Sequence, residues 1–331
     1  MAQTTNDGMS GGRSHLDSHG LSARTMDILL HSWSSGTKKQ YYVYLNKWIS
    51  FALEHNVDIC TPSVGQVLDF LTFLFDNGAS YSALNTARSA LAVVVTLKDN
   101  SAGLGDHPLI KRFFKGVFKT RPSFPRYKQT WNVSTVLSYL RKKAPAKKLN
   151  LRDLSTKLVM LCFLVTGQRC QTIHLMDIDH MSRHRDHISF HITDIVKHSR
   201  PGMPQPELIL PAFPPDRRLC VVTYLKEYLA RTAGLRKDAK LFISYSKPHK
   251  HVTRSTLSRW VRTTLHLAGI DTAIFSAHST RAASTSAAFS RNIPLSDIMK
   301  SAGWTQECTF SKFYNKPIAN PTNFATAILM N

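Results

Sequence analysis

The chain has 331 residues, of which 43% are hydrophobic, and its 43 lysines and arginines outnumber 21 aspartates and glutamates to give a formal net charge of +22. This composition can bury a sizeable core, which excludes a largely disordered chain, and the positive excess predicts a polyanionic partner, of which nucleic acid fits best. The longest apolar run, residues 158–165, is too short to span a bilayer, so no membrane contact is expected. Five cysteines without CxxC spacing indicate reduced thiols in an intracellular protein.

The N-terminal third of the chain divides into a tail and a helical region. Residues 1–20 are polar and rich in Gly and Ser, so we expect a disordered tail without the apolar segment of a signal peptide. Residues 21–120 predict a helical bundle, because apolar and aromatic residues recur every three or four positions, as in residues 37–56. Further helices are expected from a Thr61 cap to Asn77-Gly78, over residues 80–99, and from Pro108 onward.

A basic and aromatic stretch, residues 111–128, leads out of this bundle. It contains seven basic residues and no acidic one, and its two prolines place an inter-domain linker at residues 121–130. The aromatics suit the packing of the last bundle helix, while the cations face outward and predict contacts with a DNA backbone. The predicted DNA-binding residues are Lys111, Arg112, Lys115, Lys119, Arg121, Arg126 and Lys128.

Residues 131–331 predict a second domain that is mainly α-helical with a small antiparallel sheet, an α+β fold. A helix that is apolar on all sides ends at Gly167, a residue type that favours helix C-termini. Alternating or β-rich segments predict strands within residues 187–196, 207–211 and 239–245. The remaining helices are expected near residues 132–143, 216–232, 253–269, 278–290 and 295–302.

The chemistry-bearing residues gather toward the C-terminal end. His278 and Arg281 are three positions apart, so on a helix they share a face, and an imidazole beside a guanidinium suits a phosphate oxygen. Tyr314, in the aromatic and basic run 309–317, is a candidate covalent nucleophile. Each residue also has a simpler interpretation, since His278 could be a buried structural histidine and Trp304 a core residue.

Taken in order, Arg169, Lys197, His278-x-x-Arg281, Trp304 and Tyr314 resemble the signature of the tyrosine recombinases, the phage-integrase-like enzymes that break and rejoin DNA. The segments TGQRCQTI, KHSRPG, HSTRAASTSAA, AGW and FYNKP are most similar to recombinases of DIRS-type retrotransposons. The resemblance covers residues from about 130 to 317 and extends more loosely to the helical region, which it identifies as a core-binding domain.

The resemblance implies a site-specific recombinase or integrase of a mobile element, acting on double-stranded DNA as a homo-oligomer, a tetrameric synapse. Arg169 and Arg281 would hold the phosphate, His278 would assist Tyr314 in forming a 3′-phosphotyrosyl bond, and Lys197 would protonate the leaving oxygen. No metal or cofactor is expected. The alternatives are an inactive DNA-binding relative, or strand relaxation of the topoisomerase kind. From its spacing alone, Lys197 would be interpreted as a solvated lysine in a turn.

The chain departs from the family pattern at three positions. Trp304 takes the place of a histidine and cannot shuttle a proton, Thr172 replaces an acidic residue, and Phe313 stands at the usual nucleophile step, one residue before Tyr314. Elsewhere, four histidines within 180–191 lack a convincing set of metal ligands. Residues Arg141 to Lys148 form a weak nuclear-import-like run, indicating a nuclear protein in a eukaryote and a cytoplasmic one otherwise. Residues 317–331 could pack on their own domain or on a neighbouring copy.

Overall fold

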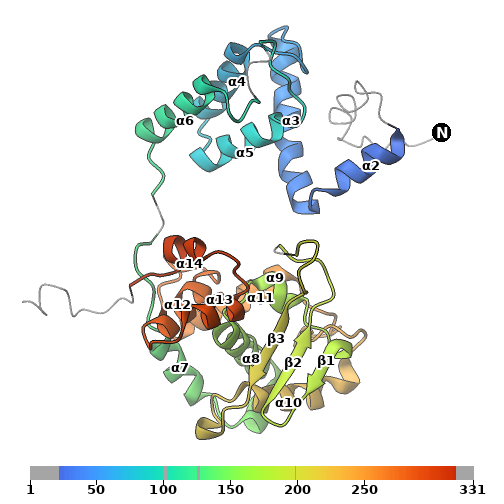
Figure 1. The fold of residues 1–331 in the computed structure, drawn as a ribbon. Helices are drawn as coiled ribbons and strands as arrows, with labels where there is room; N and C mark the ends of the chain where they lie inside the picture. The colour runs from blue at the N-terminus through green and yellow to red at the C-terminus, as the bar shows by residue number, and fades with distance from the viewer. Residues whose placement is uncertain (1–21, 100–102, 125–126, 198, 318–331) are drawn as a thin grey trace, which may run out of the picture. The chain divides into compact units, whose positions relative to one another are not determined.

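The computed structural model describes residues 22–99, 103–124, 127–197 and 199–317 (Figure 1). The chain divides into two compact units between residues 125 and 126, inside the segment expected to be a linker. The expected tail at residues 1–20, Arg126 and the C-terminal residues 318–331 lie outside the described part. Among the described helices, none is long and apolar enough to cross a membrane.

The first unit is a helical bundle with an aromatic core (Figure 1). Its helices are α2 (Ala23–His31), α3 (Ser35–Glu54), α4 (Val64–Asp76), α5 (Tyr81–Leu91) and α6 (Pro108–Thr120). The serines that precede α2 to α5 accept hydrogen bonds from backbone N–H groups of the first turn, which is why these helices begin where they do. The fully buried Trp48 packs edge-on against Phe70 with ring centres 5.2 Å apart.

Two expectations about this unit are wrong in detail. The cap of α4 is Ser63, in a reciprocal capping box with Gln66, and not Thr61. Helix α5, expected over residues 80–99, ends at Leu91 and does not continue to residue 99. Three β-branched valines follow within 93–95, and beyond them the backbone bonds instead to the chain before α4, with Thr96 donating to the Cys60 carbonyl.

The second unit is mostly helical with one small sheet, as the sequence predicts (Figure 1). Its helices are α7 (Val133–Lys142), α8 (Leu151–Thr166), α9 (Cys170–His174), α10 (Val221–Thr232), α11 (Arg254–Leu267), α12 (Ser279–Phe289), α13 (Leu295–Ala302) and α14 (Glu307–Phe313). The short helices α9 and α14 were not expected from the sequence, because neither is long enough to show a clear period.

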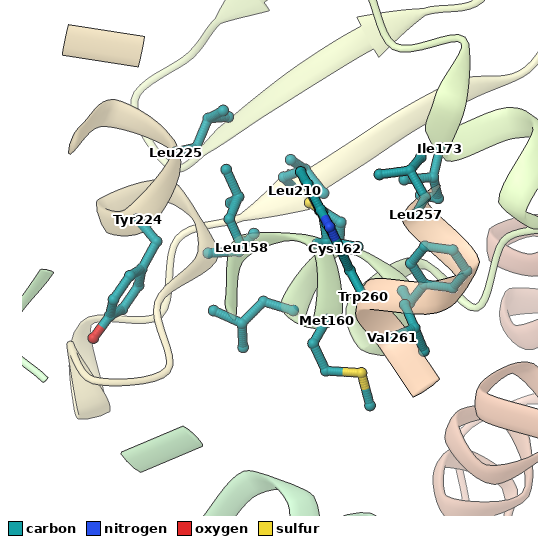
Figure 2. Packing of buried hydrophobic residues seen from close by; sticks show 14 of the residues in the cluster. Leu158, Met160, Cys162, Ile173, Leu210, Tyr224, Leu225, Leu257, Trp260 and Val261 are labelled. Atoms are coloured by element: carbon teal, nitrogen blue, oxygen red, sulfur yellow. The ribbon is translucent and has the colours of Figure 1, made fainter. Parts of the chain in front are cut away.

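Helix α8 is the centre of the second unit (Figure 2). It contacts α10, α11, α12 and the sheet, and most of its residues are buried, which explains the apolar run over residues 158–165. Figure 2 shows Leu158 and Cys162 of α8 among Leu210 of the sheet, Leu225 of α10 and Trp260 of α11. Because α8 is packed between these elements, the residues that follow it start from a fixed position.

The sheet has three antiparallel strands in the order β1-β2-β3, formed by β1 (Met181–Arg183), β2 (His187–His191) and β3 (Glu207–Pro211). The expectation of a strand at residues 239–245 is wrong. The sheet instead contains β1 as its third strand, beside the two strands that were expected. Leu241 and Ile243 are buried as expected of an apolar run. However, the backbone here bonds to two separate segments, at Met176 and around residues 250–252, so only isolated bridges form.

Candidate active site

The first predicted site residue, Arg169, is placed by the end of α8. Gly167 caps this helix in the left-handed conformation with φ of 60°, which turns the chain sharply. Gln168 is buried and donates from Nε2 to the Ser301 carbonyl at 2.6 Å, which joins this turn to α13. Arg169 follows, half-buried, at the N-terminus of α9.

Arg281 is the most buried charged group of the site. It lies in the first turn of α12 with 1% of its surface exposed, and its Nη1 donates to the Gly167 carbonyl at 2.8 Å. Within the described residues, its Nε and Nη2 atoms make no hydrogen bond. A buried guanidinium with two free donors is costly unless an anion completes it, and a phosphate oxygen pair fits such a fork.

Trp304 orders the groups around it. It follows Gly303, the left-handed cap of α13, and is 7% exposed. Its ring lies 4.2 Å from the guanidinium carbon of Arg281 and 4.6 Å, centre to centre, from the ring of Tyr314. Its buried Nε1 has no partner in the described residues. The indole therefore packs against both a cation and a phenol and also offers one hydrogen-bond donor.

Tyr314 reaches the site despite the additional residue before it. It lies just beyond α14, and its hydroxyl is 3.1 Å from Nε2 of His278. Phe313 occupies the usual nucleophile step but points away, with 56% of its surface exposed. The end of the short helix absorbs the extra residue, since Tyr314 and Asn315 both donate their N–H groups to the Phe310 carbonyl.

The charges of the site act on one another. Partial burial, and then the charges of Arg281, Arg169 and Lys197, lower the pKa of His278 below its ordinary value. Burial and the charge of Arg169 lower the pKa of Arg281 to about 10, a shift that Tyr314 opposes. At neutral pH the imidazole is therefore neutral and the guanidinium still charged. A neutral His278 can accept the phenolic proton of Tyr314 through Nε2.

Lys197 lies at the edge of this cluster. It is exposed in the turn that leads from β2 to β3, directly after the buried Val196. Ser199 shapes the turn, since its hydroxyl accepts from the Val196 N–H and donates to Gln205, both at 2.9 Å. The charge of Lys197 acts on the pKa of His278, which places Lys197 within electrostatic reach of that histidine.

Comparisons with known proteins identify the family of the chain. A model of the phage integrase family matches residues 133–319, more than half of the chain. The chain belongs to the phage integrase family. This confirms the resemblance at the level of the family, while the similarity to DIRS-type elements stays a prediction. Among curated proteins, no sequence match was found.

Solved structures of family members share the fold at low identity. The XerH site-specific recombinase bound to palindromic difH substrate, in a post-cleavage complex, has a TM-score of 0.60 at 15% identity, over 88% of this chain and 80% of that one. A lambda integrase dimer bound to a COC′ core site has a TM-score of 0.52 at 14% identity, over 94% and 97%. The Tn1549 transposon integrase bound to transposon right-end DNA has a TM-score of 0.52 at 11% identity, over 81% and 84%.

Several supporting residues of this family site were not found from the sequence. They include Ser286 of α12, whose hydroxyl donates to the Tyr314 carbonyl at 2.7 Å. Gly167 was expected only as the end of a helix, and the bond from Arg281 to its carbonyl was not. Trp131 donates from Nε1 to the hydroxyl of Ser279, the neighbour of His278, at 2.9 Å. The run of small residues at 282–288 was the one available signal, because small side chains allow another backbone to approach a helix closely.

The first unit carries a basic groove between α5 and α6, which we call the α5–α6 groove. It has a volume of about 860 Å³, a floor of aromatic rings and a rim without acidic residues. Its lining includes Tyr81, Phe114 and Phe118 together with Arg88, Lys111, Arg112, Lys115 and Lys119. The aromatics thus pack between the helices, and four of the seven cations predicted to bind DNA line one surface.

The other predicted DNA-binding cations are placed differently. Arg121 donates to the carbonyls of Ala79 and Phe75 and stacks on the Phe75 ring at 4.0 Å, which indicates a role in closing the bundle. Lys128 is exposed in the second unit, and Arg126 lies outside the described residues. Lys111, in the groove, also pairs with Asp106 at 3.0 Å.

The structure also describes two further sequence features, the histidines within 180–191 and the basic run Arg141 to Lys148. In the described residues, no group of three or more His, Cys, Asp or Glu side chains could hold a metal ion. Of the histidines within 180–191, His184 and His187 stack on each other at 4.2 Å. In the basic run Arg141 to Lys148, Arg141 pairs with Asp216 and Lys143 with Asp153. The nuclear-import interpretation of this run stays a prediction.

Proposed function

We propose that the chain is a site-specific DNA recombinase that cleaves and rejoins duplex DNA through a 3′-phosphotyrosyl intermediate on Tyr314. The observation that carries the proposal is the placement of the Tyr314 hydroxyl, 3.1 Å from His278 and next to a buried Arg281 with two unpaired donors. This is a nucleophile, a base and an anion site in one cluster. Family membership and the fold shared with DNA-bound recombinases support it.

The proposed step is a direct exchange of one phosphodiester for another. The phenolic oxygen of Tyr314 attacks the phosphorus and passes its proton to Nε2 of His278, while the bond from phosphorus to the 5′-oxygen breaks. Lys197 donates a proton to that departing oxygen. Arg169 and Arg281 stabilise the additional negative charge of the transition state through their guanidinium groups, so the step requires no metal ion.

The reverse step rejoins DNA. A phenol is a better leaving group than an alkyl alcohol, because its ordinary pKa is about 10. A 5′-hydroxyl of the same or another strand can therefore attack the phosphotyrosyl bond and release Tyr314. The energy of the phosphodiester is kept in the covalent intermediate, and no nucleotide cofactor is needed.

The wider setting is part of the same proposal. We expect the chain to act on duplex DNA as a homo-oligomer, a tetrameric synapse, in the service of a mobile element, and the α5–α6 groove supplies a cationic surface for the duplex. The XerH complex with difH supports binding to such a substrate, and the lambda integrase dimer on its core site supports an assembly of more than one copy.

Trapping the covalent intermediate tests this function. The protein is incubated with a randomised pool of nicked duplexes in EDTA, and adducts that survive denaturation are collected. We expect an adduct with the wild type and none with Tyr314→Phe, which keeps the ring packing on Trp304 and should keep DNA binding. Binding without any wild-type adduct would favour the inactive DNA-binding relative, and relaxation of a supercoiled plasmid without strand exchange would favour the topoisomerase-like alternative.

A further inference from the structure

The nucleophile is carried by a small, separate core of the second unit. Ile298, Ala302, Trp304 and Phe310 form a cluster distinct from the main core around α8. Helix α14 has seven residues, no side-chain cap and one buried residue, Phe310. Such a short helix is not stable by itself, so contacts outside it must hold Tyr314 against His278.

One of these contacts comes from α12. The buried hydroxyl of Ser286 donates to the Tyr314 carbonyl at 2.7 Å and accepts from the Lys316 N–H at 3.1 Å. A single side chain thereby fixes the backbone on both sides of Asn315. Because α12 also carries Arg281 near its N-terminus, this contact connects the nucleophile to the helix whose arginine is proposed to bind the phosphate.

The other contacts come from residues 127–131, which we call the entry strap because the chain enters the second unit through them. Thr130 donates its N–H to the Pro317 carbonyl at 2.9 Å. Lys316 donates from Nζ to the Tyr127 carbonyl at 2.9 Å and lies 4.8 Å from the centre of the Tyr127 ring. The chain immediately after the nucleophile is therefore bonded to the strap at two successive residues.

The same strap is anchored beside the phosphate-binding residues. The Tyr127 ring packs on Phe275 with centres 5.2 Å apart, and the buried Trp131 donates to the hydroxyl of Ser279. Ser279 lies between His278 and Arg281 in sequence, and its hydroxyl donates to the Ser276 carbonyl at 2.7 Å. One strap of five residues thus contacts both parts of the active site, the segment with the base and the segment after the nucleophile.

We propose that the entry strap and Ser286 are positioning elements that hold Tyr314 in the site of its own chain, with Lys316 as the residue that joins strap and nucleophile. This inference rests on the proposed function for its effect on chemistry, but the docking of α14 is a separate property of the fold. Lys316 does not touch the reacting atoms. It acts by keeping residues 314–317 against residues 127–130.

The test uses the full chain and four variants. Lys316→Met keeps the length of the side chain and removes the donor to Tyr127, whereas Lys316→Arg keeps a donor and a cation. Lys312→Met is the matched control, because Lys312 is an exposed lysine of α14 that approaches Phe313 and not the strap. Ser286→Ala is a second disrupting variant that suits a helix interior.

Two measurements are made on each variant. Amide hydrogen exchange of residues 307–316 without DNA reports docking, and the rate of covalent adduct formation at saturating nicked DNA reports chemistry apart from binding. We expect Lys316→Met and Ser286→Ala to exchange faster and to form the adduct about tenfold more slowly or worse. This is the scale of one lost hydrogen bond to a charged group for Lys316 and of two lost neutral hydrogen bonds for Ser286. Lys316→Arg and Lys312→Met should stay near wild type.

The outcomes separate the two proposals. Unchanged exchange and unchanged adduct rate in Lys316→Met would overturn the strap, and so would an equal loss in Lys312→Met, since the cause would then be lost charge. If the wild type forms no adduct, the proposed recombinase function fails, whereas faster exchange in Lys316→Met and not in Lys312→Met still supports the strap.

Discussion

If Tyr314 cleaves DNA as proposed, its contact with His278 makes the pH dependence of that cleavage a property of one histidine. The pKa of His278 is lowered by burial and by three cations. The imidazole therefore stays neutral at pH values below about 6.5, the ordinary pKa of a histidine. A neutral ring is the form that can take the phenolic proton. Acid should therefore stop cleavage only at a pH below 6.5, where the imidazole gains its proton.

We expect the adduct rate at subsaturating DNA, which reports the groups of the free enzyme, to fall with a midpoint below pH 6.5. His278→Gln should be slower by about 10²-fold or more at neutral pH, the usual contribution of a general base, and should lose this acidic decline. Rates from pH 5 to 8 in both proteins are the measurement. A midpoint at or above 6.5, or the same decline in His278→Gln, would show that another group is titrating.

The same shift affects stability in a defined direction. Between pH 6.5 and the lower pKa of folded His278, the unfolded chain binds more protons than the folded chain, so acidification through this window lowers the free energy of unfolding. Above pH 6.5 both states are neutral at this position and the effect vanishes. The pH profile of His278→Gln, whose side chain does not titrate, provides the reference for urea unfolding at the two ends of the window.

At the scale of elements, the turn that ends α8 determines where both arginines lie. Gly167 adopts φ of 60°, its carbonyl accepts from Arg281, and a Cβ atom added there would lie 3.3 Å from Cγ2 of Thr285 on α12. An alanine at this position meets the left-handed strain of about 1–2 kcal/mol and also pushes against the helix that carries Arg281.

Gly167→Ala should therefore lose about 1–2 kcal/mol of stability and also at least about tenfold in adduct rate, which corresponds to 1.4 kcal/mol in the barrier. Gly269→Ala is the control, because Gly269 has φ of 86° with nothing within 4 Å of an added Cβ. It should lose similar stability and keep its adduct rate. Urea unfolding and single-turnover cleavage decide the outcome, and equal rate losses would contradict the special role of Gly167.

The elements that the sequence predicted well are those with a long, clear pattern. Helix α8 could be found because it contains the apolar run 158–165 and is followed by a glycine, and α12 because it begins at the His278 motif. Helices α9 and α14 are too short to show a period. The segment 239–245 has strand composition, but its partners come from two places in the chain, a tertiary fact that no local pattern contains.

The site was predicted to the extent that its residues form ordered motifs. The structure brings Arg281, Trp304, Tyr314 and His278 into contact and puts Arg169 and Lys197 within electrostatic reach. The groups that support them escaped prediction, because the bonds from Ser286 to Tyr314 and from Trp131 to Ser279 join residues 28 and 148 positions apart. Serines and a single tryptophan have no spacing rule that would reveal such partners.

At the scale of the whole molecule, the net charge of +22 should dominate DNA affinity. Each phosphate neutralised by a lysine or arginine releases counterions, so the logarithm of the binding constant falls with the logarithm of salt concentration by about 0.9 per contact. The α5–α6 groove gathers Arg112, Lys115 and Lys119 without an acidic neighbour in its lining. Its cations should therefore contribute to that slope individually.

Replacing both Lys115 and Lys119 with glutamine should reduce the steepness of the salt dependence by about 2, since each lost phosphate contact removes about 0.9. The control replaces Lys237 and Lys250, two exposed lysines of the second unit, and lowers the net charge equally. Affinity for a mixed-sequence duplex, measured by fluorescence anisotropy from low to moderate salt, provides both slopes.

If the two double variants change the slope alike, the groove has no special part in binding, and the general charge of the protein accounts for its attraction to DNA. If only the groove variant changes it, the duplex is held by local contacts with phosphates between α5 and α6, because a uniform field would respond to total charge alone.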